Sequence, residues 1–187
     1  MASAPPDEPR LEPLRRTLPG AESDALVTAA YADWHEPLFG FLMSATRDRE
    51  VAEDLLQETF LRLVGEVRAG RAPKDLRPWL YRVASNLVIS RARRRAVAGR
   101  WLSQLVQRDS GEAADAEMLR QERSGDLERL LGQLSSDARV GLLLAAHGFS
   151  GAEVAATIGR SDGATRALLC RSRLQLRQLI EAEEGAA

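Results

Sequence analysis

The sequence predicts an all-α protein of two small helical domains joined by a flexible linker. Ala, Leu, Arg and Glu dominate the composition, and all four favour helix. Runs of Val, Ile, Thr and aromatic residues, which favour strands, are almost absent. Apolar residues instead recur in steps of three and four, as on one face of a helix. With 187 residues, 44% of them hydrophobic, the chain can bury one large core or two small ones.

The N-terminal third predicts an extension followed by two helices. Residues 1–24 hold five of the eight prolines, so we expect a disordered extension. Helical spacing from Ala25 to Ala45 predicts the first helix, and Pro37 inside it predicts a kink or two abutting helices. Asp48 is the expected N-cap of the next helix, which ends near Arg68.

A loop, a long helix and a linker are expected to follow. The glycine and proline in residues 69–75 predict the loop. A helix over 77–98, with Pro78 in its first turn, begins apolar and ends basic. This helix closes a first domain over residues 25–98. Residues 99–125 are polar and predict a flexible linker, with a transient helix around 113–123.

The last third predicts a second domain, residues 126–182, with a short acidic tail at 183–187 after it. We expect helices over 126–134, over 136–147 with Ser135 as N-cap, from Ser150 to Gly159, and over 162–182. Ser150 and Glu153 have the spacing of a capping box, and Gly159 suits a left-handed C-cap. Ser161 is the expected cap of the last helix. Two helices joined by a turn that contains glycine, the second helix basic, predict a helix-turn-helix.

Several classes of function are disfavoured by the sequence. The single cysteine, Cys170, excludes an internal disulfide framework, and no Cys/His cluster has zinc spacing. Neither a signal peptide nor an apolar run of the roughly 18–20 residues that span a membrane is visible, so we expect a cytoplasmic protein without membrane insertion. No phosphate loop or nucleophile–base pair stands out, so we expect no enzyme, cofactor or metal. His35 and His147 stand as isolated residues without a catalytic role.

The net charge of −1 conceals two basic blocks. Residues 68–100 carry ten basic residues and one acidic residue, and residues 154–180 carry five and one. Arginine in such blocks suits contacts to phosphates and base edges, because its planar group donates in pairs. The second block lies on the predicted last helix, where Arg166, Arg171 and Arg173 indicate DNA binding. A helical hairpin with a solvated basic face is the alternative there.

Three other groups each allow a functional and a plain structural interpretation. The arginines at the end of the 77–98 helix could neutralise phosphates, or could simply complement the helix dipole. Trp79 and Tyr81, with Asn86 further along, could stack on unpaired bases, although core packing explains Trp79 equally simply. The helix face with Asp54, Gln57 and Glu58 is either a docking surface or an ordinary solvated face.

Three stretches resemble a known family, the extracytoplasmic-function (ECF) sigma factors of bacterial RNA polymerase. Residues 52–63, AEDLLQETFLRL, resemble the conserved helix of sigma region 2. Residues 79–89, WLYRVASNLVI, and the arginines after them resemble the next helix of that region. Residues 130–179 are similar to sigma region 4. The resemblance thus implies region 2 over about 30–96 and region 4 over about 126–180.

The resemblance implies a sigma factor that binds core RNA polymerase and promoter DNA, and that an anti-sigma factor holds in check. The implied polymerase-binding residues are Asp54, Gln57, Glu58 and Leu61. Those implied for the −10 element are Trp79, Arg82, Asn86, Arg91, Arg93, Arg94 and Arg95. Those implied for the −35 element are Ser161, Arg166, Cys170, Arg171 and Arg173.

The chain departs from the family pattern at several positions. Ser90 stands where Asp is common, and Leu134-Ser135 stands where Leu-Pro is frequent. Two polar positions of the recognition helix have become Ala167 and Leu168, which puts the −35 contact in doubt. Two alternatives therefore stay open. One is a sigma-like protein that binds polymerase or an anti-sigma factor without directing transcription, and the other is a dimeric helix-turn-helix regulator.

Overall fold

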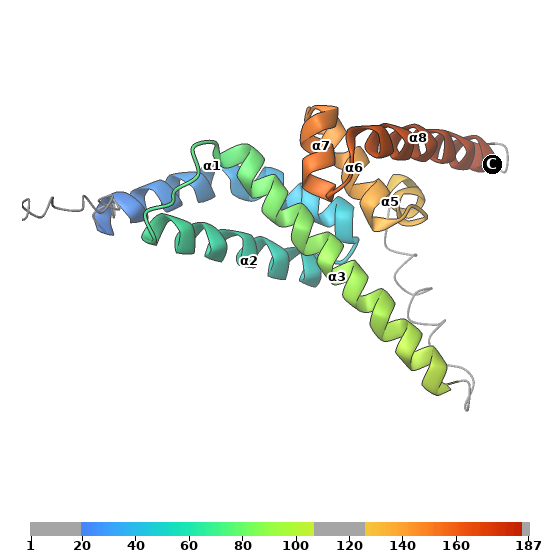
Figure 1. Ribbon diagram of the computed structural model, residues 1–187, viewed down its shortest axis with the longest axis horizontal. Coiled ribbons are helices and arrows are strands. Elements are labelled where there is room, and N and C mark those ends of the chain that lie inside the picture. The colour runs from blue at the N-terminus through green and yellow to red at the C-terminus, as the bar shows by residue number, and fades with distance from the viewer. Residues whose placement is uncertain (1–19, 107–125, 185–187) are drawn as a thin grey trace, which may run out of the picture.

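The described part of the chain, residues 20–106 and 126–184 of a computed structural model, is helical throughout its regular elements (Figure 1). The predicted extension up to residue 19, residues 107–125 of the linker and residues 185–187 of the tail lie outside it. The helices are α1 Gly20–Thr46, α2 Arg49–Arg68, α3 Leu76–Val106, α5 Asp126–Gly132, α6 Ser136–Ala146, α7 Gly151–Ile158 and α8 Asp162–Glu184.

Three helices are longer than the sequence predicted, and one of them, α8, extends to Glu184, two residues into the predicted tail. Helix α1 begins at Gly20, so residues 20–24 of the expected extension are helical. It continues through Pro37 as one helix, and the two abutting helices that we considered there do not form. Helix α3 continues to Val106, which makes residues 99–106 helical although the sequence placed them in the linker. The helix continues through Gly99, a residue that lowers helix stability but does not by itself end a helix.

The predicted caps are confirmed. The N–H of Val51 donates to Oδ1 of Asp48 at 3.2 Å, and the N–H of Ala138 donates to Oγ of Ser135 at 3.3 Å. Ser150 and Glu153 form the complete capping box, in which each residue's side chain accepts from the other's backbone. Gly159 has φ 69° and ψ 40°, a left-handed conformation that glycine adopts without a side-chain clash.

Helices α1, α2 and α3 form the first unit around a shared apolar core. Each presents one face to the others, and the side chains of Leu38, Leu42, Leu63 and Leu80 are completely buried. Val67 and Ala84 are equally buried. The three helices of this unit carry every residue that the sequence assigned to polymerase and to the −10 element.

Helices α5 to α8 form the second unit, which packs directly on the first. Helix α6 contacts both α1 and α3, and α7 contacts α3 (Figure 1). Val140, Leu144, Val154 and Ile158 are therefore buried in the same cluster as the core of the first unit. A smaller cluster of Leu131, Leu134 and Ala138 lies between α5 and α6. The sequence did not predict this contact between the units.

An aromatic cluster joins the two units near the start of α3. The ring of Tyr81 lies 5.1 Å from that of Phe41, 5.0 Å from that of His147 and 5.2 Å from that of Phe149. Arg77 donates to the backbone carbonyl of His147 and lies over the Phe149 ring. Burial and the Arg77 charge lower the pKa of His147 below its ordinary value. The expectation that His147 is isolated was wrong.

Further contacts between the units are polar. Nη1 of Arg139 on α6 donates to the carbonyl of Ala45 on α1 at 2.8 Å. Its other nitrogens donate to the carbonyls of Leu131 and Gly132 at the end of α5 and of Leu134 after it, so this one side chain links three helices. Asp137 lies 3.8 Å from Nη2 of Arg93 on α3. Among the described residues, no helix is long and apolar enough to cross a membrane.

Candidate nucleic-acid and partner interfaces

The outer face of α2 presents the residues predicted to dock on a protein partner. Asp54 and Gln57 are exposed, and Glu58 is half-buried and paired with Arg62 at 2.9 Å. The side chain of Leu61 is 57% exposed, which is unusual for leucine. The spacing 54, 57, 58, 61 places these side chains on one stripe of the helix, as the sequence predicted.

An apolar groove of about 530 Å³ runs beside this stripe, between α1 and α2. Gln57 and Leu61 line its α2 wall, whereas Asp54 and Glu58 lie outside it. The α1 wall is aromatic, with Tyr31, His35 and Phe39. Tyr31 is 49% exposed, and its ring lies 4.9 Å from that of Phe60. The sequence analysis assigned Tyr31 and Phe39 to no site and described His35 as isolated, so it missed the α1 wall.

The middle of α3 carries a polar groove of about 450 Å³. Asn86, Arg93 and Arg94 line it together with Ser90, because positions 86, 90, 93 and 94 fall on one face of a helix. Arg62 of α2 closes the opposite side. The sequence analysis did not include Arg62 in any site. Its position four residues after Glu58 gave no hint that it faces another helix.

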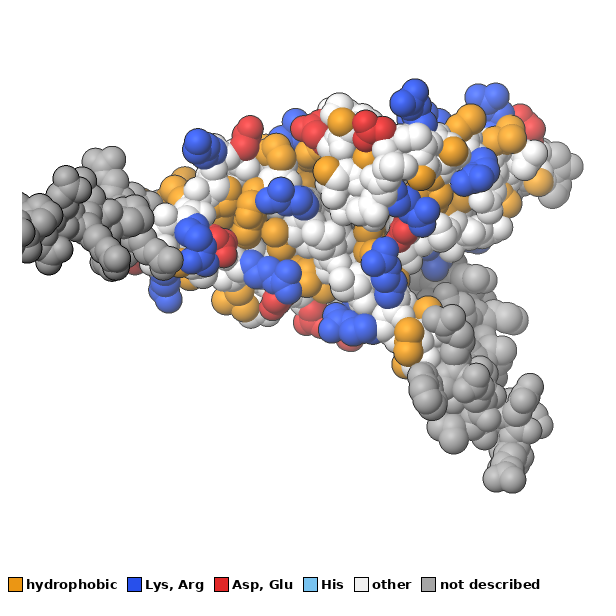
Figure 2. Space-filling model, in the orientation of Figure 1, with side chains coloured by type: hydrophobic (Ala, Val, Ile, Leu, Met, Phe, Trp, Pro, Cys, Tyr) orange, Lys and Arg blue, Asp and Glu red, His pale blue; other side chains and the backbone are white. Residues whose placement is uncertain are grey.

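The basic end of α3 divides into two faces. Arg93 and Arg94 lie with Asn86, whereas Arg91 and Arg95 line a different cavity that faces the α1–α2 turn and α6. The structure therefore does not bring the four arginines into one patch, as their adjacency in the sequence suggested. Figure 2 shows Lys and Arg side chains along α3 and again over α8.

The aromatic residues at the start of α3 are not equivalent. Tyr81 is only 2% exposed and packs between the two units, so it has no free face for a base. Its role in stacking, which the sequence allowed, is thereby excluded in this structure. Trp79 is half-buried and packs against the core. Arg82, which follows Tyr81 in the sequence, is exposed.

Helices α7 and α8 form the predicted helix-turn-helix. Glu153 accepts from the hydroxyl and the backbone N–H of Ser150, and these hydrogen bonds lower the pKa of that carboxyl. The N–H of Ala164 donates to Oγ of Ser161 at 3.3 Å, which confirms the cap of α8. Arg160 in the turn donates to Asp137 of α6 at 2.7 Å and so holds the turn against the rest of the unit.

The outward face of α8 carries the predicted base-reading residues. Arg166, Cys170, Arg171 and Arg173 are all exposed, and Thr165, Leu169 and Ser172 are buried on the opposite face. Leu168 is half-buried and packs against both apolar clusters. Of the two departures from the family pattern, Leu168 is therefore a packing residue, whereas Ala167 is exposed.

Similarity to known proteins bears on these surfaces. The family model for sigma-70 region 2 matches residues 30–97, which span most of α1, all of α2 and the first two thirds of α3. The ECF RNA polymerase sigma factor EcfG of Rhodopseudomonas palustris (strain TIE-1) is 30% identical over 148 residues, covering 76% of this chain and 78% of that protein. The chain belongs to the ECF sigma factor family. Sigma factors are not enzymes.

Two further proteins show how far the similarity extends. The ECF sigma factor SigE of Mycolicibacterium smegmatis is 32% identical over 133 residues, so the match covers 69% of this chain and only 51% of SigE. The sigma factor RpoE of Bartonella quintana, solved in complex with the anti-sigma factor NepR, has a similar fold. Its TM-score is 0.56 at 23% identity, covering 86% of this chain and 97% of that chain.

Family membership assigns names to the two units. The unit of α1 to α3 is region 2, and the unit of α5 to α8 corresponds to region 4. In the ECF sigma factor described here, regions 2 and 4 share one apolar core. Within the described residues, no group of three His, Cys, Asp or Glu side chains is placed to hold a metal ion.

Proposed function

We propose that this chain is an alternative sigma factor, which binds core RNA polymerase and directs promoter recognition and opening. The observation that supports the proposal is that this member of the ECF sigma factor family presents three chemically distinct surfaces. These are the apolar groove with its acidic stripe, the Asn86 groove on α3, and the outward face of α8.

The groove between α1 and α2 suits a protein partner. Tyr31 and Leu61 are large apolar side chains at the surface, and such patches mark interaction sites on soluble proteins. Asp54, Gln57 and Glu58 beside them provide a polar rim, as is typical of protein interfaces. We assign this surface to core RNA polymerase.

The α3 groove suits DNA in which bases leave the stack. Extruding a base costs a few kcal/mol, and a pocket that binds it offsets that cost. Asn86 can donate and accept at a base edge, and Arg93 and Arg94 beside it can neutralise the neighbouring phosphates. Trp79 and Arg82, one to two turns earlier on α3, extend the proposed −10 surface. Arg91 and Arg95 remain a prediction for this role, since they face elsewhere.

The outward face of α8 suits the major groove of the −35 element. A recognition helix contacts base edges with side chains of its N-terminal half. Arg166 and Arg171, with Cys170 between them, occupy that half, and Ser161 and Arg173 flank it. Two modest DNA contacts on one polymerase reinforce each other through effective concentration. A chain with net charge −1 can thus act on DNA when polymerase supplies much of the affinity.

The runner-up function is a sigma-like protein that binds polymerase or an anti-sigma factor without directing transcription. The exposed Ala167 favours it, because the reading face lacks a polar group there. Leu168 gives it less support, since that side chain is partly buried and packs against the core. The arginines of the α3 groove argue against it.

We further propose that an anti-sigma factor binds this chain, as NepR binds RpoE. We also propose that this chain acts in the cytoplasm.

Transcription from a fragmented genomic DNA pool tests the proposal. Purified core polymerase should produce transcripts with shared upstream elements only when the wild-type protein is added. A polymerase that binds the protein and yet starts no transcript on any fragment would establish the runner-up. Tight binding of the protein alone to duplex DNA, as a dimer, would contradict both.

A further inference from the structure

We propose that the ion pair between Glu58 and Arg62 on α2 couples the docking of polymerase to the binding of single-stranded DNA. Glu58 belongs to the acidic stripe, whereas Arg62 lines the groove on the middle of α3. In the free chain Glu58 holds Arg62, and a partner that binds Glu58 releases Arg62 for a DNA phosphate. The inference rests on the proposed function, which assigns the stripe to polymerase and the groove to DNA.

The groove that Arg62 closes is basic on two sides. Arg93 and Arg94 line it from α3, and Arg62 faces them from α2. The other described residues that line it are uncharged, so no carboxylate among them stands opposite these three arginines. A cleft lined by one sign of charge concentrates ions of the opposite sign. The backbone of a DNA strand is therefore a suitable ligand for all three arginines.

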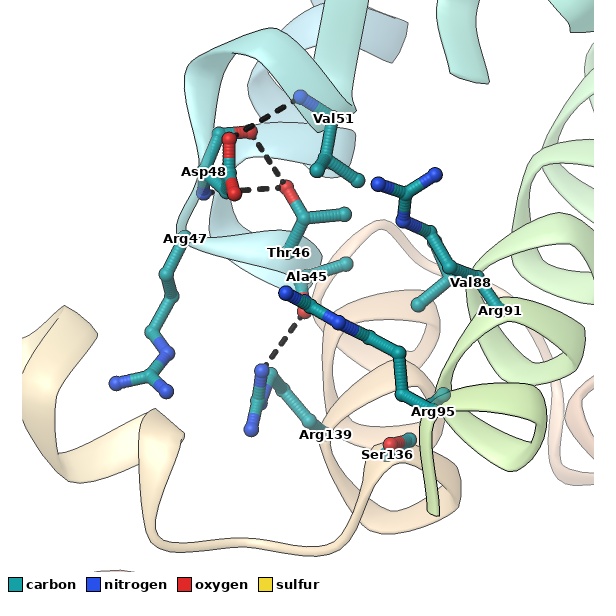
Figure 3. A pocket seen from close by; sticks show the side chains of 11 residues that line it. Ala45, Thr46, Arg47, Asp48, Val51, Val88, Arg91, Arg95, Ser136 and Arg139 are labelled. Atoms are coloured by element: carbon teal, nitrogen blue, oxygen red, sulfur yellow. Dashed lines mark hydrogen bonds between the residues drawn. The ribbon is translucent and has the colours of Figure 1, made fainter. Parts of the chain in front are cut away.

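The other two arginines near the end of α3 do not serve this groove. Arg91 and Arg95 lie on a different side of the helix and extend toward the α1–α2 turn and α6 (Figure 3). Helix α3 thus supplies only two cations to the groove, and the third comes from α2. Because each neutralised phosphate adds to the affinity for a strand, Arg62 is a substantial part of what the groove can offer.

Arg62 stands at the border between the two surfaces of α2. Leu61 lines the apolar groove between α1 and α2, and the next residue, Arg62, lines the groove on α3. Successive residues lie about 100° apart around a helix, so one turn of α2 reaches both surfaces. Glu58 lines neither groove and lies one turn before Arg62. Its carboxylate is therefore accessible to a partner on the stripe while it pairs with Arg62.

The ion pair is weak enough to exchange. Nε of Arg62 lies 2.9 Å from Oε1 of Glu58, and the two side chains are 48% and 45% exposed. Water screens a pair this exposed, so a DNA phosphate or a cation of the partner can replace either member. The coupling is reciprocal, because DNA that takes Arg62 also leaves Glu58 free for the partner.

A second ion pair on the same helix provides a matched comparison. Nε of Arg49 lies 2.8 Å from Oε1 of Glu53, again with a separation of four residues. Both residues line the apolar groove, and neither lines the groove on α3. Glu53→Gln therefore removes the same charge as Glu58→Gln and also releases an arginine, but one that lies outside the DNA surface.

The DNA contact is tested by fluorescence anisotropy of a short labelled single-stranded DNA of random sequence, titrated with the full chain at several salt concentrations. Arg62→Ala should lower the slope of log affinity against log salt by about 0.7, the contribution of one phosphate on a single strand. Circular dichroism checks that the variant is folded. If the wild type does not bind the DNA, or if Arg62→Ala has the same affinity and slope as the wild type, Arg62 is not a DNA contact and the proposal fails.

The control that Glu58 exerts on Arg62 is tested with the same DNA. Glu58→Gln should bind it about twofold more tightly than the wild type, as expected from the loss of an exposed pair on a helix. The gain should disappear when Arg62→Ala is also present, and Glu53→Gln should show none. A gain that persists without Arg62, or an equal gain in Glu53→Gln, would mean that only the overall charge matters and would overturn the proposal.

The coupling itself is tested with core polymerase, whose affinity for the labelled chain is measured with and without a saturating amount of the same DNA. The DNA should raise the affinity of the wild-type chain about twofold more than that of Arg62→Ala. Equal changes in the two chains would show that docking and DNA binding are independent, against the proposal. A chain that binds no core polymerase at all would overturn the proposed function and the coupling together, whereas the two measurements on DNA alone need no polymerase.

Discussion

The hydroxyl of Tyr81 lies 3.2 Å from Nδ1 of His147, although 66 residues separate them in the sequence. Tyr81 belongs to region 2, and His147 ends the helix of region 4 that packs on it. The two rings and that of Phe41 form one buried cluster. This pair therefore joins the two regions at the position where α3 begins, and it makes their packing sensitive to the charge of an imidazole.

Lowering the pH should destabilise the wild type more than the His147→Gln variant. The pKa of His147 is lowered in the folded protein below its ordinary value of 6.5. As pH falls through 6.5, the unfolded state takes up protons that the folded state resists, so stability is lost. Urea unfolding at about pH 7.5 and about pH 5.5 measures the loss. Equal losses in both proteins would mean that His147 does not titrate in this window.

Tyr81 should contribute mostly through packing. Tyr81→Ala removes a fully buried ring and should cost about 3–5 kcal/mol of unfolding free energy. Tyr81→Phe loses only the hydrogen bond to His147 and should cost about 1 kcal/mol. Chemical denaturation of the two variants checks the difference. If Tyr81→Phe is as destabilising as Tyr81→Ala, the ring packing described here is not the main contribution.

Gly159 should be required for its backbone conformation rather than for space. Gly159→Ala should destabilise region 4 by about 1–2 kcal/mol, because φ is 69° and a β-carbon is strained there. Gly65→Ala is the matched control, since a β-carbon on Gly65 in the interior of α2 meets nothing within 4 Å. It should stabilise the protein by about 0.5–1 kcal/mol. Thermal melting should show a lower melting temperature for Gly159→Ala and a higher one for Gly65→Ala.

Leu61 should matter for polymerase and little for folding. Leu61→Asp places a charge in the apolar groove and should weaken core polymerase binding at least about tenfold, as expected for an interface anchor. Its melting temperature should stay close to wild type, because the side chain is largely exposed. Glu50→Gln, exposed in the first turn of the same helix, serves as control. If the Leu61→Asp variant binds core polymerase as the wild type does, the groove is not part of the docking surface.

Local structure could be predicted well from the sequence. The caps at Asp48, Ser135 and Ser150 and the left-handed turn at Gly159 follow from short-range hydrogen bonding, which nearby residues decide. The buried face of α2 follows from its three- and four-residue spacing in the same way. The helix-turn-helix was predictable because each of its signals lies within a few residues of the next.

The contact between the regions could not be predicted. It brings Tyr81 to His147 and Arg139 to Ala45 across separations of 66 and 94 residues, and no local pattern encodes such pairs. The same holds for the division of the α3 arginines, because neighbouring positions on a helix face different partners. The packing role of Leu168 was not predictable for a similar reason, because this side chain packs against two apolar clusters whose residues lie far from it in the sequence.

The count of transcripts that core polymerase starts on a genomic DNA pool tests the central claim most directly. The account predicts transcripts that appear with the wild-type protein and share one −10 sequence, and that fall at least about tenfold with Asn86→Ala. The Asn86 side chain is exposed, so the variant should fold normally and still bind polymerase. Transcripts that persist unchanged in Asn86→Ala, or that never appear with the wild type, would contradict it.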